Sequence, residues 1–410
     1  MKKIIFFVIM LVCSYSKVYA SSNSGVMVNG LVYDNLEDAI NNMRSGEEIK
    51  LLSDMVVEDT INIDKKVIID LNNRTIEKDN FIFRVDGGEL ILKGKGVLKE
   101  NKPYYSPIVI KGSNNMNDSN YSIVTVGKDV TLIGWSGIFI DRNKNSNSSY
   151  GIRIDVDGTL KGVNDINNDE GIGVYVNGAI KNDSNYPLIN LGKTSKIISS
   201  GVGIYNAGYA KINIDGASIT GVSSGIAIKS GILNIVSGSI YAIGRYEGET
   251  EGNNNGVNSS GSSIQVESNS NYKGNIIINI SGGRIESKNS YSFYEYIGSG
   301  SSTSIKEISI NGGNFISKRD NFKFSNNFLN THKHFITGGS FTSNISNYVK
   351  EGYDIKYKDN KYIIEDKMVM RDVDIDINNN KFIDKILSIV LIIITFMLSL
   401  IVAKRRRLHT

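Results

Sequence analysis

Residues 203–219 read GIYNAGYAKINIDGASI, and residues 225–240 repeat the same order of segments as GIAIKSGILNIVSGSI. Each stretch contains a glycine-led apolar segment, a short apolar strand, a turn of small residues and one further apolar residue, Ile219 or Ile240. Short apolar alternation that is interrupted by Gly, Asn, Asp or Ser predicts strand–turn–strand and not helix. We therefore expect a β-structure that repeats along the chain.

The repeat extends well beyond these two stretches. The apolar residues that follow the turns are 21, 45, 30 and 26 residues apart, and an extra turn around Ile264-Gln265-Val266 accounts for the longest gap. The glycine-led segments begin at Gly137, Gly151, Gly171, Gly201 and Gly225, and the residues that follow the turns are Ile219, Ile240, Ile285, Phe315 and Phe341. Three short strands per turn predict an all-β fold, a parallel β-helix over residues 61–345 with about a dozen coils and a length of about 55 Å. The lack of a strict six-residue period argues against the left-handed hexapeptide type and favours the right-handed one.

The alternation of apolar and polar residues along each strand predicts which side chains form the core of the β-helix. In a strand over residues 152–157, the apolar side chains at 152, 154 and 156 should point into the coil, and Arg153, Asp155 and Asp157 should face solvent. Gly and Asn at the corners tolerate the left-handed backbone of tight bends. The chain has 3 Pro in 410 residues, which suits a fold whose ladder positions must donate an N–H group.

Both ends of such a solenoid need a cover. Residues 35–46 predict a short helix within an N-terminal cap of residues 21–60: Asn35 is suited to the N-cap and Gly46 to the end, and the apolar residues share one face. That face consists of Leu36, Ala39, Ile40 and Met43. At the other end, residues 346–365 predict a β-hairpin cap with its turn at Asp359-Asn360.

The first twenty residues have the pattern of a secretory signal. Lys2-Lys3 is followed by an apolar run that ends at Cys13, and Val18-Tyr19-Ala20 offers small side chains for cleavage after Ala20. Cys13 is the one cysteine, so neither disulfides nor thiolate chemistry are expected in the secreted part.

The C-terminal segment predicts a membrane anchor. Residues 386–403 contain no charged side chain, and about 18 residues of helix reach close to the hydrocarbon thickness of a bilayer. Lys404-Arg405-Arg406-Arg407 follows, so by the positive-inside rule residues 404–410 should be cytoplasmic and residues 366–385 an extracellular stalk. We expect a single-pass protein of the cell membrane with an extracellular N-terminal ectodomain.

The distribution of charge argues against nucleic-acid binding. The formal net charge is +4, but seven of the 46 lysines and arginines lie in the signal and the basic tail, which leaves 39 bases against 42 acids between them. The exported part therefore has no basic excess to neutralise phosphates along a nucleic acid.

Several stretches resemble the β-helical, pectate-lyase-like surface proteins of Gram-positive bacteria. They are residues 36–40 (LEDAI), 67–76 (VIIDLNNRTI) and 336–341 (ITGGSF). The resemblance implies the architecture of a surface protein and no particular chemistry. Many such proteins end in a sortase signal, but Pro103, Pro107 and Pro187 are the only prolines here, so we expect a simple membrane anchor.

Enzymes with this architecture use clustered acids, and an alternative function is a lyase or hydrolase of acidic polysaccharides. The best candidates are Arg153, Asp155 and Asp157 on one strand and Asp141 on the strand before it. The paired aspartates and Gly-His-Gly runs of the related enzymes are not present. Outward charges on a solenoid are more often a solvated face, so we assign no catalytic residue.

Metal and cofactor sites are not expected. His332 and His334 alternate on a predicted strand and should point one way, but no third ligand is nearby. The alternating Asp372, Asp374 and Asp376 lack the Gly and the distal Glu of a calcium loop, and a charged stalk is the better interpretation.

The densest aromatic cluster, Tyr291, Phe293, Tyr294 and Tyr296, should be divided between the two faces of its strand. Residues 244–262 predict a long loop off the rod. Our leading hypothesis is a non-enzymatic adhesin that binds a glycan or protein ligand. The polysaccharide lyase or hydrolase is the alternative, and a purely structural role in the cell envelope is a third hypothesis.

Overall fold

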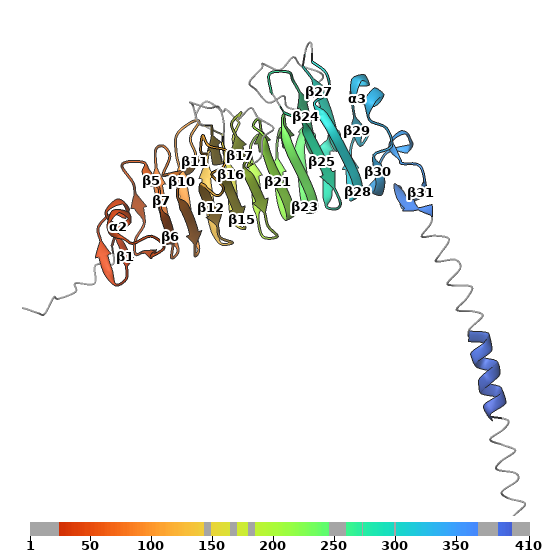
Figure 1. Cartoon of the computed structure of the whole chain (residues 1–410), viewed down its shortest axis with the longest axis horizontal. Helices are drawn as coiled ribbons and strands as arrows, with labels where there is room; N and C mark the ends of the chain where they lie inside the picture. Colours follow the sequence, from red (N-terminus) through yellow and green to blue (C-terminus); the bar gives the residue numbers. More distant parts are fainter. Residues whose placement is uncertain are drawn as a thin grey trace, which may run out of the picture.

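Successive strands of this chain pair with strands about one repeat further along the sequence, and most of these pairings are parallel. They are seen in a computed structural model, which describes residues 24–142, 149–164, 170–178, 185–245, 260–272, 274–298, 301–367 and 384–395. The strands lie side by side along an elongated body, with the chain advancing from one end to the other (Figure 1).

One sheet has ten strands in the described part of the chain, all parallel, and each strand pairs with the next pass of the chain. Its strands are β5 (Ile61–Ile63), β8 (Phe83–Asp86), β11 (Ile108–Lys111), β14 (Ser136–Asp141), β17 (Ile172–Val176), β20 (Val202–Asn206), β22 (Ser224–Ile228), β24 (Ile264–Ser268), β27 (Phe293–Ile297) and β29 (Phe322–Lys323). We call it the ten-stranded sheet.

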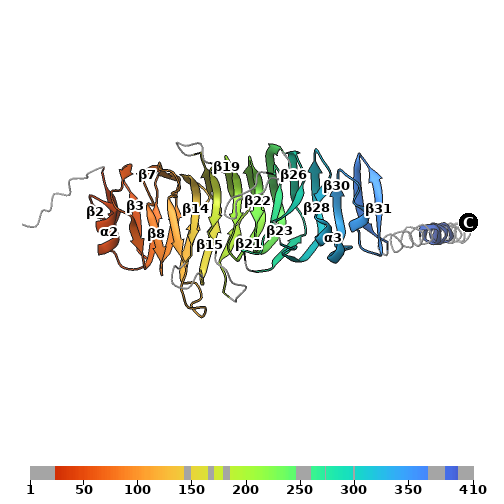
Figure 2. The ribbon, with the colours of Figure 1, turned by 90° about the horizontal axis from the view of Figure 1, so that it is seen from above.

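The larger sheet contains a first row of strands, each paired with the next. The row consists of β3 (Glu48–Leu51), β6 (Lys66–Asp70), β9 (Glu89–Lys93), β12 (Ser122–Val126), β15 (Ile152–Val156), β18 (Leu188–Leu191), β21 (Ala210–Gly221), β23 (Gly231–Arg245), β25 (Ile276–Ile280), β28 (Ile305–Ser317) and β30 (Ile336–Phe341). Figure 2 shows the strands from above, in sequence along the long axis.

A second row belongs to the same sheet because β21, β23, β28 and β30 bend through both rows. The other strands of this row are β4 (Met55–Val56), β7 (Arg74–Lys78), β10 (Gly96–Glu100), β13 (Val130–Gly134), β16 (Thr159–Gly162), β19 (Lys196–Ser199) and β26 (Arg284–Asn289). Each pass of the chain thus contributes a strand to the first row, the second row and the ten-stranded sheet. This mostly parallel all-β arrangement is compatible with a β-helix.

The core lies between the two sheets and is built from aligned aliphatic residues. Ile138, Val174, Ile204 and Ile226 follow one another in register on the ten-stranded sheet, and all are fully buried. On β15 the predicted alternation holds: the residues at 152, 154 and 156 are buried, whereas Arg153 is exposed. Burial of a whole aliphatic side chain is worth about 1.5–3 kcal/mol, so this column is a major source of stability.

Glycine occurs where the ten-stranded sheet approaches the second row most closely. A Cβ added to Gly173 would lie 2.1 Å from the Ile197 side chain, and one added to Gly203 would lie 2.6 Å from Ile219. Gly137 and Gly225 face Leu160 and Ile240 in the same way. The glycines that stack are therefore Gly137, Gly173, Gly203 and Gly225, and the predicted alignment on Gly171 and Gly201 was wrong by two residues.

Helix α2 (Leu36–Asn42) lies at the N-terminal end of the body, beside the antiparallel pair β1 (Val26–Val28) and β2 (Leu31–Tyr33) (Figure 1). The Asn35 side chain accepts a hydrogen bond of 2.7 Å from the Asp38 N–H, as an N-cap should. The apolar face expected of this helix is buried. The helix ends at Asn42, earlier than Gly46, and Gly46 has a φ of 87° in the loop that follows.

At the C-terminal end, β31 (Tyr353–Lys358) and β32 (Lys361–Asp366) form an antiparallel hairpin, and β32 pairs with β30. Asp359 and Asn360 have φ values of 51° and 58°, as a two-residue hairpin turn of this kind requires. Two short elements precede the hairpin, helix α3 (Asn326–Thr331) and the 3₁₀ turn η1 (Ser346–Tyr348).

Residues 384–395 are helical. Among the described residues no helix has the length and apolar character to cross a membrane. The predicted signal, most of the stalk, the second half of the predicted span at residues 386–403 and the basic tail lie outside the described residues.

Candidate functional site

The acidic strand face predicted from the sequence is occupied by contacts within the protein. Arg153 Nε lies 2.8 Å from Asp155 Oδ2, and Asp155 Oδ1 accepts a hydrogen bond of 2.7 Å from Asn190 Nδ2. Asp155 and Asn190 are direct partners in the register of β15 and β18. Both carboxylate oxygens of Asp155 are therefore engaged.

Asp155 ends a row of asparagine side chains, which we call the asparagine ladder. It runs over the outer face of the first row through Asn190, Asn213, Asn234 and Asn279. The amide of each residue donates to the side-chain oxygen of the one before it, with distances of 2.8, 2.8 and 2.9 Å. The Arg153–Asp155 pair is thus the acceptor end of a structural hydrogen-bond chain.

Asp141 does not join this group, because β14 belongs to the ten-stranded sheet and β15 to the larger one. Its carboxylate accepts from Asn177 Nδ2 at 3.3 Å. Asp157 follows β15, and its backbone oxygen accepts from the Thr194 hydroxyl at 2.9 Å. The prediction that Asp141, on the preceding strand, joins Arg153, Asp155 and Asp157 in one group was therefore wrong.

The prediction that His332 and His334 alternate on a strand was wrong. The Ser325 hydroxyl caps helix α3 by accepting from the Phe328 N–H, and His332 terminates that helix. His334 has a φ of 60°, and its Nδ1 donates to the Val349 carbonyl at 2.8 Å. The described residues contain no group of three or more side chains placed to hold a metal ion, and Asp372, Asp374 and Asp376 lie outside them.

The aromatic cluster near residue 293 is divided between faces, as alternation predicts. Phe293 is in the core, and the Tyr291 and Tyr294 rings stack at 6.1 Å on the outer side. Lys323 Nζ lies 5.5 Å from the centre of the Tyr294 ring. The rings thus pack on each other and on a cation from the next strand.

A further aromatic group was not predicted, and we call it the aromatic ladder. Phe139, Tyr175 and Tyr205 are register partners on the outer face of the ten-stranded sheet, and their rings stack at 5.1 Å in both steps. Four more rings extend it, namely Phe81, Tyr104, Tyr105 and Trp135. The available sequence signal was an aromatic residue two positions after the stacking glycine, as in GIFI (137–140), GVYV (173–176) and GIYN (203–206).

The outer edge of the aromatic ladder reaches solvent at Tyr104. This side chain is 56% exposed, has a φ of 65°, and its ring lies 5.4 Å from that of Trp135. Trp135 in turn contacts Tyr175 at 5.8 Å, and its buried indole Nε1 has no hydrogen-bond partner. Tyr205, at the other end, is 2% exposed, and burial raises the pKa of both Tyr205 and Tyr175.

A buried carboxyl group lies next to this edge. Glu100 ends β10 with 3% exposure; its Oε1 accepts from the Lys102 N–H, and its Oε2 is buried without a partner. Burial raises the pKa of Glu100 to about 7, although backbone N–H groups of Lys102 and Trp135 oppose the shift. Glu100 can therefore exchange a proton near neutral pH.

Further along the ten-stranded sheet, the outer face holds a buried ion pair. Lys229 Nζ is 2.8 Å from Glu267 Oε2, and the two side chains are only 2% and 5% exposed. Gln265 donates to the other Glu267 oxygen at 2.6 Å. The rings of Tyr205 and Tyr272 flank the ammonium group, with centres at 5.2 and 4.7 Å.

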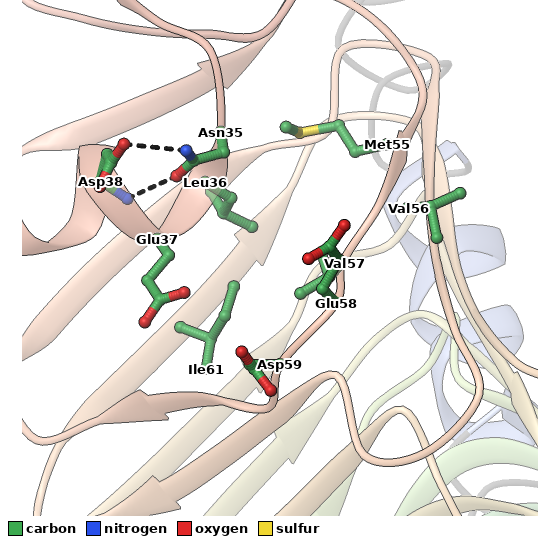
Figure 3. Close-up of a pocket in the computed structure, with 10 residues that line it drawn as sticks. All are labelled: Asn35, Leu36, Glu37, Asp38, Met55, Val56, Val57, Glu58, Asp59 and Ile61. Carbon is green, nitrogen blue, oxygen red and sulfur yellow. Dashed lines mark hydrogen bonds between the residues drawn. The ribbon is translucent and has the colours of Figure 1, made fainter.

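An acidic cleft of about 350 Å³ lies at the N-terminal end, between the start of α2 and residues 55–61. Figure 3 shows Glu37, Glu58 and Asp59 around it, with Asp38 turned towards Asn35. None of these carboxylates has a lysine or arginine partner among the described residues. The cleft by itself indicates no particular ligand.

Comparison with known proteins adds no relative: no family model, curated protein or solved structure matches this chain. The chain is assigned to no family here. The resemblance to pectate-lyase-like surface proteins therefore depends on the sequence stretches quoted above and on the mostly parallel β architecture.

Proposed function

We propose that this chain is a surface-displayed parallel β-helix protein that binds a glycan through the aromatic ladder. The solenoid interpretation is supported by the parallel register from pass to pass and by the shared interior column of aliphatic residues. It also explains why equivalent residues recur on the outside, as asparagines on one face and aromatic rings on another.

The aromatic ladder is the observation that carries the proposal. Pyranose rings have apolar C–H faces, which pack against tyrosine and tryptophan rings, while the polar tips of these residues remain available for hydrogen bonds. Tyr104 offers an exposed ring, which contacts the Trp135 ring at 5.4 Å. The exposed ring lies in the turn between β10 and β11, next to the ten-stranded sheet, and exposed apolar surface is a common sign of a binding site.

Display at a cell surface is supported by the sequence at both ends. A signal pattern precedes residue 21, and the uncharged run over residues 386–403 is followed by Lys404-Arg405-Arg406-Arg407. An anchor of this kind would hold the binding face outside the cell.

The lyase or hydrolase alternative has no supporting observation. Its best candidates were the acids around β15, and Asp155 has both oxygens engaged by Arg153 and Asn190. An acid–base pair for catalysis needs a carboxylate that can reach a substrate proton.

A glycan array probed with the full-length chain in a mild nonionic detergent tests the proposal. We expect a defined set of glycans to bind, and Tyr104→Ala to weaken the strongest by about tenfold, the equivalent of about 1.4 kcal/mol. Tyr357→Ala is the matched control, because Tyr357 is also exposed but lies on the C-terminal hairpin. Absence of glycan binding, or equal losses in the two variants, would contradict the proposal.

A further inference from the structure

A second cleft, of about 430 Å³, lies near the C-terminal end of the body, and its lining is basic. Three segments that are distant in sequence meet there: Lys306 comes from β28, Lys333 from the residues after α3, and Lys350 from those after η1. His332 and His334 also line the cleft. We call it the basic cleft.

The positive charge of the basic cleft is only partly neutralised. Glu307 is the acidic residue in the lining, and its carboxylate is 3.9 Å from Lys306 Nζ. Neither Lys333 nor Lys350 has a carboxylate within ion-pair distance in the described part of the chain. This local excess of cations contrasts with the exported part of the chain, which has slightly more acids than bases.

The donors that the cleft offers to an anion are mainly its lysine ammonium groups. His334 donates its Nδ1–H to the Val349 carbonyl, so the Nε2 of a neutral His334 ring is an acceptor and adds no donor to the cleft. His332 is held by the Thr331 hydroxyl at 2.9 Å and the Lys306 carbonyl at 3.2 Å, which fixes its ring at the edge of the cleft. The Ser309 and Thr337 hydroxyls and the side chain of Asn279, the last residue of the asparagine ladder, also line the cleft.

We propose that the basic cleft binds a phosphate group of an anionic ligand. Its cations are lysines without an arginine, and separate ammonium groups act as point charges on the several oxygens of a phosphate, whereas a planar carboxylate is matched best by the guanidinium fork. The site lies on the larger sheet and its C-terminal loops, apart from the aromatic ladder on the ten-stranded sheet. It is therefore independent of the proposed glycan site.

Calorimetric titration of the full-length chain in nonionic detergent tests this inference. The probes are an oligo(glycerol phosphate) hexamer as a soluble phosphodiester, short-chain phosphatidylglycerol as a lipid source, and a hyaluronan hexasaccharide as a carboxylate. We expect a phosphate probe to bind more tightly than hyaluronan. The double substitution Lys333→Gln and Lys350→Gln should weaken that binding at least tenfold.

The matched control is Lys95→Gln with Lys193→Gln, which removes the same charge from exposed lysines outside the cleft. We expect this control to change affinity less than twofold. All four lysines are exposed, so each variant should retain its melting temperature. Loss of binding confined to the cleft variant supports the inference, and the probe affected identifies the source of the phosphate.

Three results would overturn the inference: no binding of either phosphate probe, tighter binding of hyaluronan, or equal losses in the cleft and control variants. None of these depends on the aromatic ladder, since Tyr104→Ala should leave phosphate binding unchanged. Failure here and failure of the proposed glycan binding are thus distinguishable.

Discussion

On both sheets, outward side chains of successive strands contact one another along the rod, but the residue types differ between the two sheets. On the first row of the larger sheet, four asparagines bond to one another along the rod and end on Asp155. On the ten-stranded sheet, the outer face carries stacked rings and, two residues beyond the row of rings on later strands, a buried Lys229–Glu267 pair. On the first face the side-chain amides satisfy one another's hydrogen bonds. On the second face aromatic rings and an ion pair are largely buried.

This difference follows from stacking in register. Parallel strands about 4.8 Å apart bring equivalent side chains into contact, so one residue type repeated at one position makes a continuous row. A row of amides satisfies its own hydrogen bonds in the presence of water. A row of aromatic rings has no such hydrogen bonds, and its exposed member, Tyr104, is the ring to which we assign ligand binding.

The largest effect should come from breaking the buried ion pair. Lys229→Ala leaves the Glu267 charge buried without its partner, and we expect a loss of about 3–5 kcal/mol in the free energy of unfolding. The double variant Lys229→Met with Glu267→Met should recover most of that loss, because it removes both charges. Urea denaturation of the full-length chain measures both. A loss below about 1 kcal/mol for Lys229→Ala would show that this face is not closed to water.

The next effect depends on pH. The pKa of Glu100 is about 7 in the folded protein against an ordinary value of 4.5, so the folded state binds the proton more tightly than the unfolded state. Its contribution to stability is therefore complete at low pH and is lost as the pH rises from about 4.5 to about 7, by up to about 3 kcal/mol.

Glu100→Gln keeps a neutral side chain at every pH and should abolish this part of the pH dependence. The measurement is the free energy of unfolding of both proteins from pH 4 to pH 8. The variant should be the more stable protein at pH 8. Parallel curves for the two proteins would contradict the assignment of the titration to Glu100.

The smallest effect should come from the asparagine ladder. Asn213→Ala removes one hydrogen bond to Asn190 and one from Asn234, and we expect a loss of about 1–2 kcal/mol in the free energy of unfolding. Lys211→Ala, on the same strand outside the ladder, should cost less than about 0.5 kcal/mol. Equal costs would indicate that the ladder adds nothing beyond a solvated face.

The burial pattern of a strand, the start of a helix and the position of a turn could be predicted, because residues close together in the sequence determine them. The alternation at residues 152–157 predicted which side chains are buried, Asn35 predicted the start of α2, and Asp359-Asn360 predicted the hairpin turn. The strand predicted at His332 was wrong because the Ser325 hydroxyl caps residues 326–331 as helix α3, which ends at His332. Each of these outcomes depends on a few residues in sequence.

The rows of outward residues could not be predicted in the same way. Phe139, Tyr175 and Tyr205 are 36 and 30 residues apart, because loops of different length separate the strands, and no fixed period aligns them. The same variation hid the pairing of Asp155 with Asn190 and made Asp155 look like a free acid. Register depends on which strands pair in three dimensions, and the local pattern leaves that open.

The most direct test of the account is a pair of distances along one outer row. Glu77 and Thr220 are separated by five strand pairings in the second row, and Glu77 and Glu286 by seven. Spin labels on cysteines at these positions, in a Cys13→Ser background, should give distances of about 24 and about 34 Å by double electron–electron resonance. If the second distance is not longer than the first, as could occur in a two-layer sandwich, the result would contradict a β-helix of stacked coils.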